Sequence, residues 1–371
     1  MSITQIDNTH FHFKDIDLSI VNALRRIIIS EIPNVAINFD VTDVTHSDFI
    51  INKNTCALHN EFLAHRVSLI PVCLNEDEIN DFDPENYVFK IKEKNTTAEI
   101  MSITSKHIQI FDKNDKKMVD KNRNRIFPAN PKTKDYILIT KLKPNLSNLN
   151  EGEEIDIVCK ASKNIAMVHA RWSPVSHCSF INSVDEIESQ KALEAKLETA
   201  KDGKEKESIT SQFKTLDMFR YFKKNKYDEP NEFDFTIESE CALTPFYLLK
   251  TSFAVLIQRL TNFIINLDDS SKVKINQIVS IPNFYELEIK DETYTLLNVL
   301  QSMIYNINMR ETANKSKNLE FIGYYNPHPL DNKMILKVKF TSDAIILKDF
   351  LKENCEAIIK ILNGYNEFLK E

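Results

Sequence analysis

The sequence predicts an α+β protein that carries two similar helix-and-strand modules in one chain. Residues 17–37 (DLSIVNALRRIIISEIPNVAI) contain an amphipathic helix that is followed by an extended apolar segment, and residues 291–340 repeat this order. Neither stretch contains a nucleophile, a metal-binding cluster or a phosphate-binding loop. Both helices have the pattern of surfaces that pair with another helix, so an assembly role is favoured over catalysis.

Composition limits the classes of protein to consider. With 371 residues, 42% of them hydrophobic and 27% charged, the chain is long enough for two or three domains. The formal net charge of −7 argues against a broad nucleic-acid-binding face, and four scattered glycines cannot form a glycine-rich phosphate loop. Because the N-terminal residues lack an apolar signal segment and no apolar run approaches the roughly 20 residues that span a bilayer, we expect an intracellular protein.

The cysteines and histidines do not form a recognisable metal site. The six cysteines are scattered without a CxxC pair, which in an intracellular protein indicates free thiols. The tightest grouping is His169, His177 and Cys178, and it lacks the paired spacing of a structural zinc site. We therefore expect packing roles for these three residues, and no metal or cofactor.

The first helix is predicted to begin at a cap provided by Asp17 or Ser19 and to end before Pro33, which forces Ile32 to be extended. Its apolar residues share one face: Ile20, Leu24, Ile27 and Ile28. Polar residues share another: Asn22, Arg25 and Arg26. A strand with alternating inward residues is expected next: Val35, Ile37, Phe39 and Val41. We assign residues 1–37 and 231–265 to a discontinuous first module.

Between these two parts, residues 38–230 contain many short alternating segments, which predict a mainly β insertion domain. Within it, residues 187–215 are rich in Glu, Lys and Ala and indicate an exposed helix or a mobile excursion. The first module then resumes with a helix that is capped by Thr244 and has Pro245 at its first position. Apolar residues recur along this helix at spacings of four and three, as in a packed helix pair: Leu249, Phe253, Leu256, Leu260 and Phe263.

A polar linker at 266–283 is expected to lead to the second module at 284–371, which starts with a strand at Phe284–Lys290. Its first helix carries an apolar face: Leu296, Leu300, Met303 and Ile307. Its last helix is predicted to begin at Ser342 and carries one long stripe: Leu347, Leu351, Cys355, Ile358, Leu362, Tyr365 and Leu369. Ordinary core packing explains each stripe alone. Two long stripes at the ends of two similar modules suggest that the modules pack on each other.

Several motifs in the first half resemble the third-largest subunit of eukaryotic and archaeal RNA polymerase, the counterpart of one bacterial α subunit. That family has a helix with N-x-L-R-R, an E-I-P turn and then E-F-I-A-H-R-x-x-L-I-P, which correspond here to residues 22–26, 31–33 and 61–71. Its H-A-K-W-S-P motif appears as HARWSP at 169–174 and includes the only tryptophan, Trp172. The segment FDFTIES at 233–239 is similar to the family's strand before its long dimerisation helix.

The second half resembles the small partner of that subunit, the eleventh subunit of eukaryotic RNA polymerase II and the L subunit of archaeal enzymes. Residues 324–330 match the pattern Y-x-x-P-H-P-L, and three residues match part of E-D-H-T-L-G-N: Thr295, Leu296 and Asn298. Three positions depart from the latter pattern: Thr293, Tyr294 and Leu297. Leu297 suits a continuous helix, so pairing should survive. The presence of both partners in one chain resembles the fused subunit of large eukaryotic DNA viruses.

The resemblance implies two RNA polymerase α-like dimerisation modules that form an intramolecular pair. Such a pair is a non-catalytic platform on which the second-largest (β-like) and largest (β′-like) subunits assemble, with a small zinc-bearing subunit alongside and little or no direct DNA contact. The zinc-binding cysteine cluster of many third-largest subunits is expected to be absent, because residues 74–158 contain no cysteine. If the chain is viral, its place is the host cytoplasm and the virion.

The resemblance also assigns residues to the two kinds of contact. Residues implied to contact a large subunit are Arg25, Arg26, His65, Arg66, His169 and Trp172, with both arginines of the first helix facing away from the pair. For His169 and Trp172, internal packing is an equal alternative. Residues implied to pair the two modules are Leu24, Ile27, Ile28, Leu249, Phe253, Leu256, Leu260, Leu296, Leu300, Met303, Leu351, Ile358 and Leu362.

Two other classes of function are alternatives to an assembly role. An enzyme would have to use a group such as Asp291, Glu292 and His328, or His169, His177 and Cys178, and neither group places a nucleophile beside an oriented base at a recognisable spacing. A stand-alone scaffold or nucleic-acid-binding protein is the remaining alternative. The acidic charge balance disfavours nucleic acid as its ligand.

Overall fold

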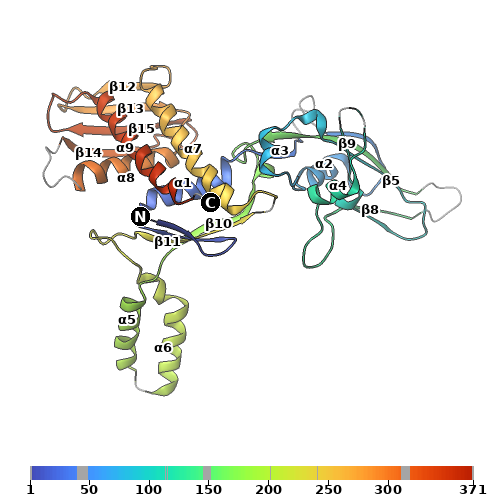
Figure 1. Ribbon diagram of the computed structural model, residues 1–371, viewed down its shortest axis with the longest axis horizontal. Coiled ribbons are helices and arrows are strands. Elements are labelled where there is room, and N and C mark those ends of the chain that lie inside the picture. The colour runs from blue at the N-terminus through green and yellow to red at the C-terminus, as the bar shows by residue number, and fades with distance from the viewer. Residues whose placement is uncertain are drawn as a thin grey trace. The chain divides into compact units, whose positions relative to one another are not determined.

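The computed structural model describes residues 2–39, 49–112, 114, 116–144, 152–200, 202–239, 241–310 and 318–369. The chain is an α+β protein, as the sequence predicts (Figure 1). It divides into two compact units. The first consists of Met1–Ile28, His177–Ile237 and Pro245–Glu371, and the second of Ile29–Ser176 and Glu238–Thr244.

The first unit contains an antiparallel sheet with strand order β1-β2-β11-β10. Its strands are β1 (Ser2–Gln5), β2 (His10–Lys14), β11 (Glu232–Ser239) and β10 (Val175–Asn182). Phe13 lies opposite Phe233, and Phe11 opposite Phe235, and all four side chains are fully buried. The alternation HFHFK therefore forms a half-buried strand, which our sequence analysis did not predict.

Two helices complete what we call the first module (β1, β2, β10, β11, α1 and α7). Helix α1 (Leu18–Ser30) is capped by Asp17, whose carboxylate accepts a 2.8 Å hydrogen bond from the Ser19 amide, so the first of the two predicted caps is confirmed. Helix α7 (Pro245–Asn266) begins at the predicted proline. The predicted apolar faces of both helices are buried: Ile20, Leu24, Ile27 and Ile28 on α1, and Leu249, Phe253, Leu256, Leu260 and Phe263 on α7.

The second module (β12–β15, α8 and α9) also belongs to the first unit. Its antiparallel sheet has the order β12-β13-β15-β14, formed by β12 (Val273–Gln277), β13 (Phe284–Lys290), β15 (Lys333–Phe340) and β14 (Leu319–Tyr325). Helix α8 (Tyr294–Tyr305) packs on β14 and β15 and continues as a π-helical turn at Asn306–Arg310. Helix α9 (Leu347–Glu367) comes after the last strand of this sheet in the chain.

Two boundaries of the second module differ from the prediction. The expected linker 266–283 contains strand β12, because the segment VKINQ pairs with β13 as a mainly polar edge strand. The connection between the modules is thereby shortened to residues 267–272. Helix α9 begins at Leu347 and not at Ser342, because residues 341–346 form a bend and turn before the helix.

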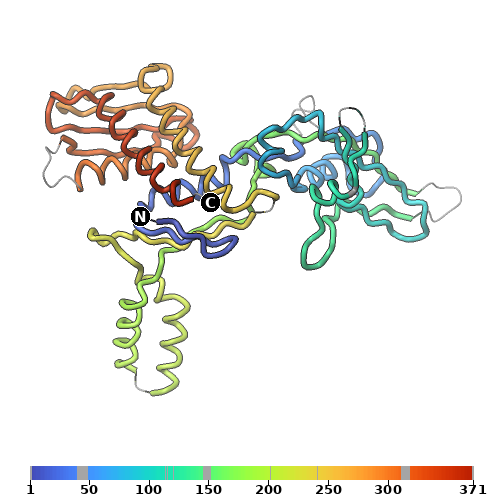
Figure 2. Tube along the Cα trace, viewed as in Figure 1, coloured from blue at the N-terminus to red at the C-terminus, as the bar shows by residue number. Residues whose placement is uncertain are grey.

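Helix α7 packs along α9 and also contacts α8, so the two modules lie against each other within the first unit. Figure 2 shows the C-terminal helix beside the N-terminal segment. In agreement, the Tyr365 hydroxyl near the end of α9 donates a 2.8 Å hydrogen bond to the Asp15 carbonyl. We call this contact between the first and second modules the seam.

A helical hairpin follows β10, where an exposed helix or mobile excursion was expected. It consists of α5 (Glu186–Glu198) and α6 (Gly203–Thr215), which pack on each other around Leu193 and Phe213. Asp185 and Asp202 cap the two helices. The hairpin and most of β10 belong to the first unit, so the second unit does not extend through 38–230 as predicted for the insertion domain.

The second unit contains a sheet in the order β3-β9-β5-β7, in which β4 also pairs with β9, and a separate pair β6-β8. Its strands are β3 (Asn34–Ile37), β4 (Phe49–Asn54), β5 (Val88–Lys94), β6 (Met101–Thr104), β7 (Gln109–Phe111), β8 (Leu138–Leu142) and β9 (Glu154–Asn164). Short helices connect them: α2 (Asn60–Ser68), α3 (Glu76–Asn80) and α4 (Asp120–Ile126). Val41, predicted to continue the strand after α1, lies outside the described residues.

Helix α7 corrects one expectation about composition. By length and apolar content it is long enough to cross a membrane, whereas no such segment was recognised in the sequence. Packing against α9 gives the helix a buried apolar face and explains its composition without a membrane, since core helices commonly meet the same criterion.

Candidate assembly interface

The seam has an apolar centre. All residues assigned to pairing are buried, including Leu256 and Leu260 on α7, Leu300 on α8, and Leu351 and Ile358 on α9. The ring of Phe253 on α7 stacks against that of Tyr365 on α9, with centroids 6.4 Å apart. Burying aliphatic and aromatic side chains at about 25 cal/mol per Å² makes such a contact the main source of its stability.

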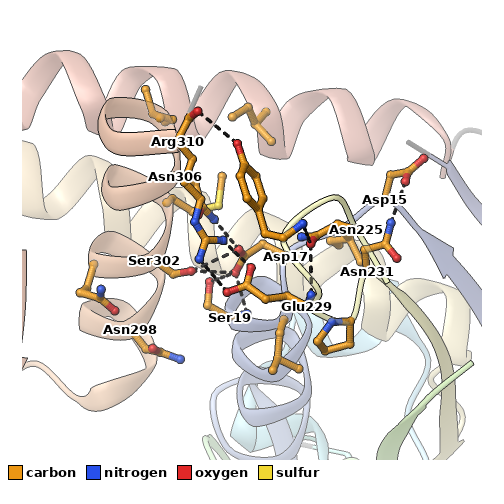
Figure 3. Close-up of a pocket in the computed structure, with 18 of the residues that line it drawn as sticks. Asp15, Asp17, Ser19, Asn225, Glu229, Asn231, Asn298, Ser302, Asn306 and Arg310 are labelled. Carbon is orange, nitrogen blue, oxygen red and sulfur yellow. Dashed lines mark hydrogen bonds and ion pairs between the residues drawn. The ribbon is translucent and has the colours of Figure 1, made fainter. Parts of the chain in front are cut away.

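At one end of the seam, Asp17 links the two modules (Figure 3). Its carboxylate accepts hydrogen bonds from the Ser302 hydroxyl at 3.1 Å and the Asn306 amide at 2.7 Å, both from the second module. The same carboxylate caps α1 through Ser19. One side chain therefore starts the helix of the first module and contacts α8 and its π-helical turn in the second.

Arg310 forms what we call the clasp, together with Glu229, Tyr227 and Tyr305. The Arg310 guanidinium makes a bidentate ion pair with the Glu229 carboxylate, with Nη2 2.7 Å from Oε1. It also lies over the rings of Tyr227 and Tyr305, at 4.7 and 5.0 Å from their centroids. The Tyr227 hydroxyl donates a 3.1 Å hydrogen bond to the Arg310 carbonyl. This pairing lowers the pKa of Glu229 and raises the pKa of Arg310.

A cavity of about 440 Å³ lies beside the clasp and is lined by both modules. Asp15, Asp17 and Glu229 contribute carboxylates to its wall, and Asn298, Ser302 and Asn306 contribute amides and a hydroxyl (Figure 3). Burial raises the pKa of Tyr365, whose hydroxyl closes one side through its bond to Asp15.

A second ion pair lies at the other end of α8. Here the second module contributes the acid and the first module the arginine. Arg259 of α7 pairs with Glu292, which lies just before α8, and its Nη2 lies 3.2 Å from the Thr293 hydroxyl. The Arg259 and Glu292 side chains are only 14% and 16% exposed. Thr293 also caps α8, which explains how a residue that departs from the family pattern is accommodated.

The two arginines of α1 face different surroundings. The Arg26 Nε donates a 2.8 Å hydrogen bond to the hydroxyl of Thr295 in the second module, so the expectation that both arginines face away from the pair is wrong for Arg26. Arg25 is half-buried and donates to the Asn22 side-chain oxygen at 3.0 and 3.1 Å.

His65 and Arg66 of α2 have different surroundings too. Arg66 donates to the backbone carbonyls of Ile139 and Leu138, both at 2.8 Å, and thereby attaches α2 to β8. His65 is exposed, and so are Phe62 and Leu69 beside it, at 59% and 47%. Arg66 thus makes intramolecular contacts with β8, whereas His65 lies on an exposed, partly apolar surface.

For the HARWSP motif, the structure favours packing for the tryptophan. Trp172 is 2% exposed, and its indole nitrogen donates a 3.0 Å hydrogen bond to the Ser162 carbonyl on β9. His169 is exposed and caps the following turn by accepting from the Arg171 amide at 3.2 Å. Arg171 in turn donates to the carbonyls of Ile37 and Phe39.

Within the part of the chain that the structure describes, no three His, Cys, Asp or Glu side chains are grouped closely enough to hold a metal ion. The acidic residues weighed as an enzyme site are engaged in structural contacts. Asp291 pairs with Lys272 and accepts from Asn332, and Glu292 pairs with Arg259. His328 accepts a hydrogen bond from the Leu330 amide in an exposed turn.

The polar residues of the seam were largely missed by sequence reasoning. Asp17 was considered only as a helix cap, and Glu229, Tyr227 and Arg310 were not singled out. Their partners lie far away along the chain, 289 positions for Asp17 and Asn306 and 81 for Glu229 and Arg310. The spacing of apolar residues along a sequence gives no information about such long-range polar contacts.

Comparison with known families agrees with this arrangement. Residues 10–260, more than half of the chain, match the family described as the RNA polymerase Rpb3/Rpb11 dimerisation domain. The chain belongs to this family. Residues 285–367 match a second family with the same description, so both modules of the seam carry the dimerisation domain.

Individual relatives fit the assignment. The chain is 35% identical over 184 residues to "DNA-directed RNA polymerases I and III subunit rpac1" of Dictyostelium discoideum, a match that spans 46% of this chain and 48% of that protein. It is 26% identical over 328 residues to "DNA-directed RNA polymerases IV and V subunit 3B" of Arabidopsis thaliana, spanning 76% and 92%. It is also 25% identical over 292 residues to the "Conjugation stage-specific protein" of Tetrahymena thermophila, spanning 67% and 88%.

Proposed function

We propose that this protein is a non-catalytic assembly-platform subunit of a multisubunit DNA-directed RNA polymerase. The observation that carries the proposal is the presence of two Rpb3/Rpb11 dimerisation domains in one chain, joined through an apolar seam. The two modules form an intramolecular α-like pair. This pair docks the second-largest and largest subunits, and a small zinc-bearing subunit binds alongside.

The connection between the modules supports intramolecular pairing. It consists of residues 267–272, and Asp268 within it is paired with Lys348 and Lys352 of α9. A short tether raises the effective concentration of the second module to roughly millimolar, so that pairing does not depend on an encounter between chains. The purified protein should therefore be a monomer.

The surfaces for the large subunits are Arg25 on the first unit and His65 on the second. Arg25 offers a planar guanidinium suited to carboxylates or carbonyls of a partner. His65 lies among exposed apolar side chains, Phe62 and Leu69, which a partner would cover. Arg26, Arg66, His169 and Trp172 make the intramolecular contacts described above, and of these four only Trp172 is buried.

The fused arrangement resembles the subunit of large eukaryotic DNA viruses, and we propose that origin. The corresponding site of action is the host cytoplasm, with packaging in the virion. A stand-alone interaction scaffold or nucleic-acid-binding protein is the alternative, and it differs in requiring no polymerase subunit for its function.

The test is an affinity pull-down of the tagged full-length chain, co-expressed with candidate large subunits. The wild type should recover the second-largest subunit, and the Arg25→Ala/His65→Ala variant should lose it. Arg220→Ala, an exposed arginine on the turn after the helical hairpin, serves as the matched control and should retain binding.

Two outcomes would contradict parts of the proposal. Retention of the large subunit by Arg25→Ala/His65→Ala would mean that the docking residues are wrong, although the platform role would stand. Failure of the wild type to recover either large subunit would remove the platform role and favour the scaffold alternative.

A further inference from the structure

The seam contains two ion pairs of opposite polarity, one at each end of α8. Before the helix, the second module provides the acid, Glu292, and the first module provides the base, Arg259. After the helix, the second module provides the base, Arg310, and the segment that leads into β11 of the first module provides the acid, Glu229. At a rise of 1.5 Å per residue, the 18 positions between Glu292 and Arg310 separate the two pairs by roughly 25 Å.

We propose that these two pairs form an orientation code that determines which module the first module accepts, and in which direction. This rests on the proposed intramolecular pairing. The code fits a partner helix that has an acidic residue just before its first turn and an arginine just after its last. A helix docked in the reverse direction would bring Arg310 toward Arg259 and Glu292 toward Glu229, so both ends would join like charges.

Burial makes the code selective. The Arg259 and Glu292 side chains are 14% and 16% exposed, whereas in the second pair Arg310 is 21% and Glu229 is 46% exposed, so the pair before α8 is the better shielded of the two. Like charges that meet in such surroundings are unfavourable, and breaking a buried pair leaves the remaining charge uncompensated. The apolar centre of the seam cannot discriminate in this way, since apolar stripes tolerate changes of partner and direction.

The clasp adds geometric requirements that a lysine would not meet. The guanidinium uses its fork for both Glu229 oxygens and its faces for the rings of Tyr227 and Tyr305. Lysine provides a point charge without the planar fork. The charges of the code also agree with the dipole of α8, which favours an acid at the N-terminus and a base at the C-terminus. The second module is therefore suited to this role before it docks.

The first test uses the full-length chain with a site for a sequence-specific protease inserted between Ser270 and Ser271, in the exposed connection. After cleavage, the wild type is mixed with a charge-swapped chain, Glu229→Arg/Arg310→Glu, at a urea concentration at which tagged and untagged wild type exchange second modules. The modules should return to matched pairs with at least tenfold preference over hybrid pairs, as measured by native mass spectrometry.

A control swap is available in the second unit. Arg125 makes a similar bidentate pair with Glu78, with Nη1 2.9 Å from Oε2, and it takes no part in the seam. The Glu78→Arg/Arg125→Glu chain should exchange second modules with the wild type at random. Preferential sorting by this control would show that any charge swap disturbs exchange, and it would overturn the code.

The second test uses intact chains and does not depend on exchange. Glu229→Arg and Arg310→Glu should each lower the urea midpoint of unfolding, and the double swap should restore most of the loss, whereas Arg310→Lys should fall between wild type and Arg310→Glu. Random sorting together with no restoration in the double swap would overturn the orientation code. If the cleaved wild type separates into its two parts under native conditions, the intramolecular pairing itself fails, which is a distinct result.

Discussion

The Asp17 carboxylate accepts a 2.7 Å hydrogen bond from the side-chain amide of Asn306, although the two residues lie 289 positions apart. The same carboxylate caps α1 through the Ser19 amide. Formation of the first helix and docking of the second module are therefore coupled through one side chain.

This coupling predicts the effect of Asp17→Ala. Losing the cap costs about 1 kcal/mol, and the unsatisfied Ser302 and Asn306 donors add a similar amount, so we expect a loss of about 2 kcal/mol in the free energy of unfolding. Ser302→Ala should cost less, because it leaves the cap intact. Urea denaturation followed by circular dichroism measures both. Equal losses in the two variants would contradict the dual role of Asp17.

Tyr365 provides a test of the contact between the ends of the chain. Its buried hydroxyl donates to the Asp15 carbonyl, and its ring stacks on Phe253. Tyr365→Phe should cost about 1 kcal/mol through the lost hydrogen bond, and Tyr365→Ala about 3–5 kcal/mol through the lost packing. Thermal and urea unfolding of the two variants would measure the difference, and a neutral Tyr365→Ala would show that α9 does not hold the seam together.

The adjacent residues of α2 should behave differently. Arg66→Ala removes two charge-assisted hydrogen bonds to β8 and should destabilise the second unit by about 1–2 kcal/mol, a range reduced for solvent exposure. His65→Ala should leave the free energy of unfolding unchanged and weaken recovery of the second-largest subunit. Stability measurements and pull-downs on the same two proteins separate these effects. A strong loss of stability in His65→Ala would be inconsistent with its exposed position.

The clasp makes stability depend on pH. Arg310 holds the pKa of Glu229 below its ordinary value of 4.5. A carboxylate whose pKa is lower in the folded than in the unfolded state contributes stability above its unfolded pKa, and this contribution is lost as the pH falls through the folded pKa. The stability difference between wild type and Arg310→Met should therefore shrink between about pH 6 and about pH 3. Urea titrations across this range would reveal a constant difference if the ion pair were unimportant.

The rate at which cysteine thiols are alkylated tests, in the wild-type protein, whether α9 stays packed in the seam. Cys355 lies on the buried face of α9, and burial raises the pKa of the Cys355 and Cys178 thiols to about 12. At pH 8 only roughly one thiol in ten thousand would then be ionised, so neither should react with iodoacetamide in the folded protein. Cys56 and Cys241 are half-buried and should be labelled first. Peptide mass spectrometry would detect rapid labelling of Cys355 if α9 were displaced from the first module.

The sequence predicted the helices of the seam well, because an apolar face repeats with the helical period over long segments such as α7 and α9. It predicted short strands poorly. The strands β1, β2 and β12 are brief and carry polar residues on their solvent faces, so each contains only one or two buried positions. The α5–α6 pair was predicted only as an exposed helix or a mobile excursion, because few of its residues are buried.

The polar contacts of the seam could not be predicted in the same way. Arg26 was expected to face a separate subunit, yet Thr295 accepts its hydrogen bond across 269 positions of sequence. Glu292 was weighed as part of an enzyme site, and Arg259 neutralises it. Charged residues have the same appearance in a sequence whether their partner is solvent, another chain or a distant segment, and only the fold distinguishes these cases.

The pairing of β2 with β11 has a consequence for synthesis on the ribosome. His12 of β2 and Asp234 of β11 face each other across 222 positions of sequence. The edge of β2 that pairs with β11 therefore cannot form its hydrogen bonds until most of the second unit has been translated. By contrast, each strand pair of β12–β15 is completed within about 70 residues near the end of the chain. The second module is therefore translated after the first module, and every copy of the chain contains the two modules in equal number.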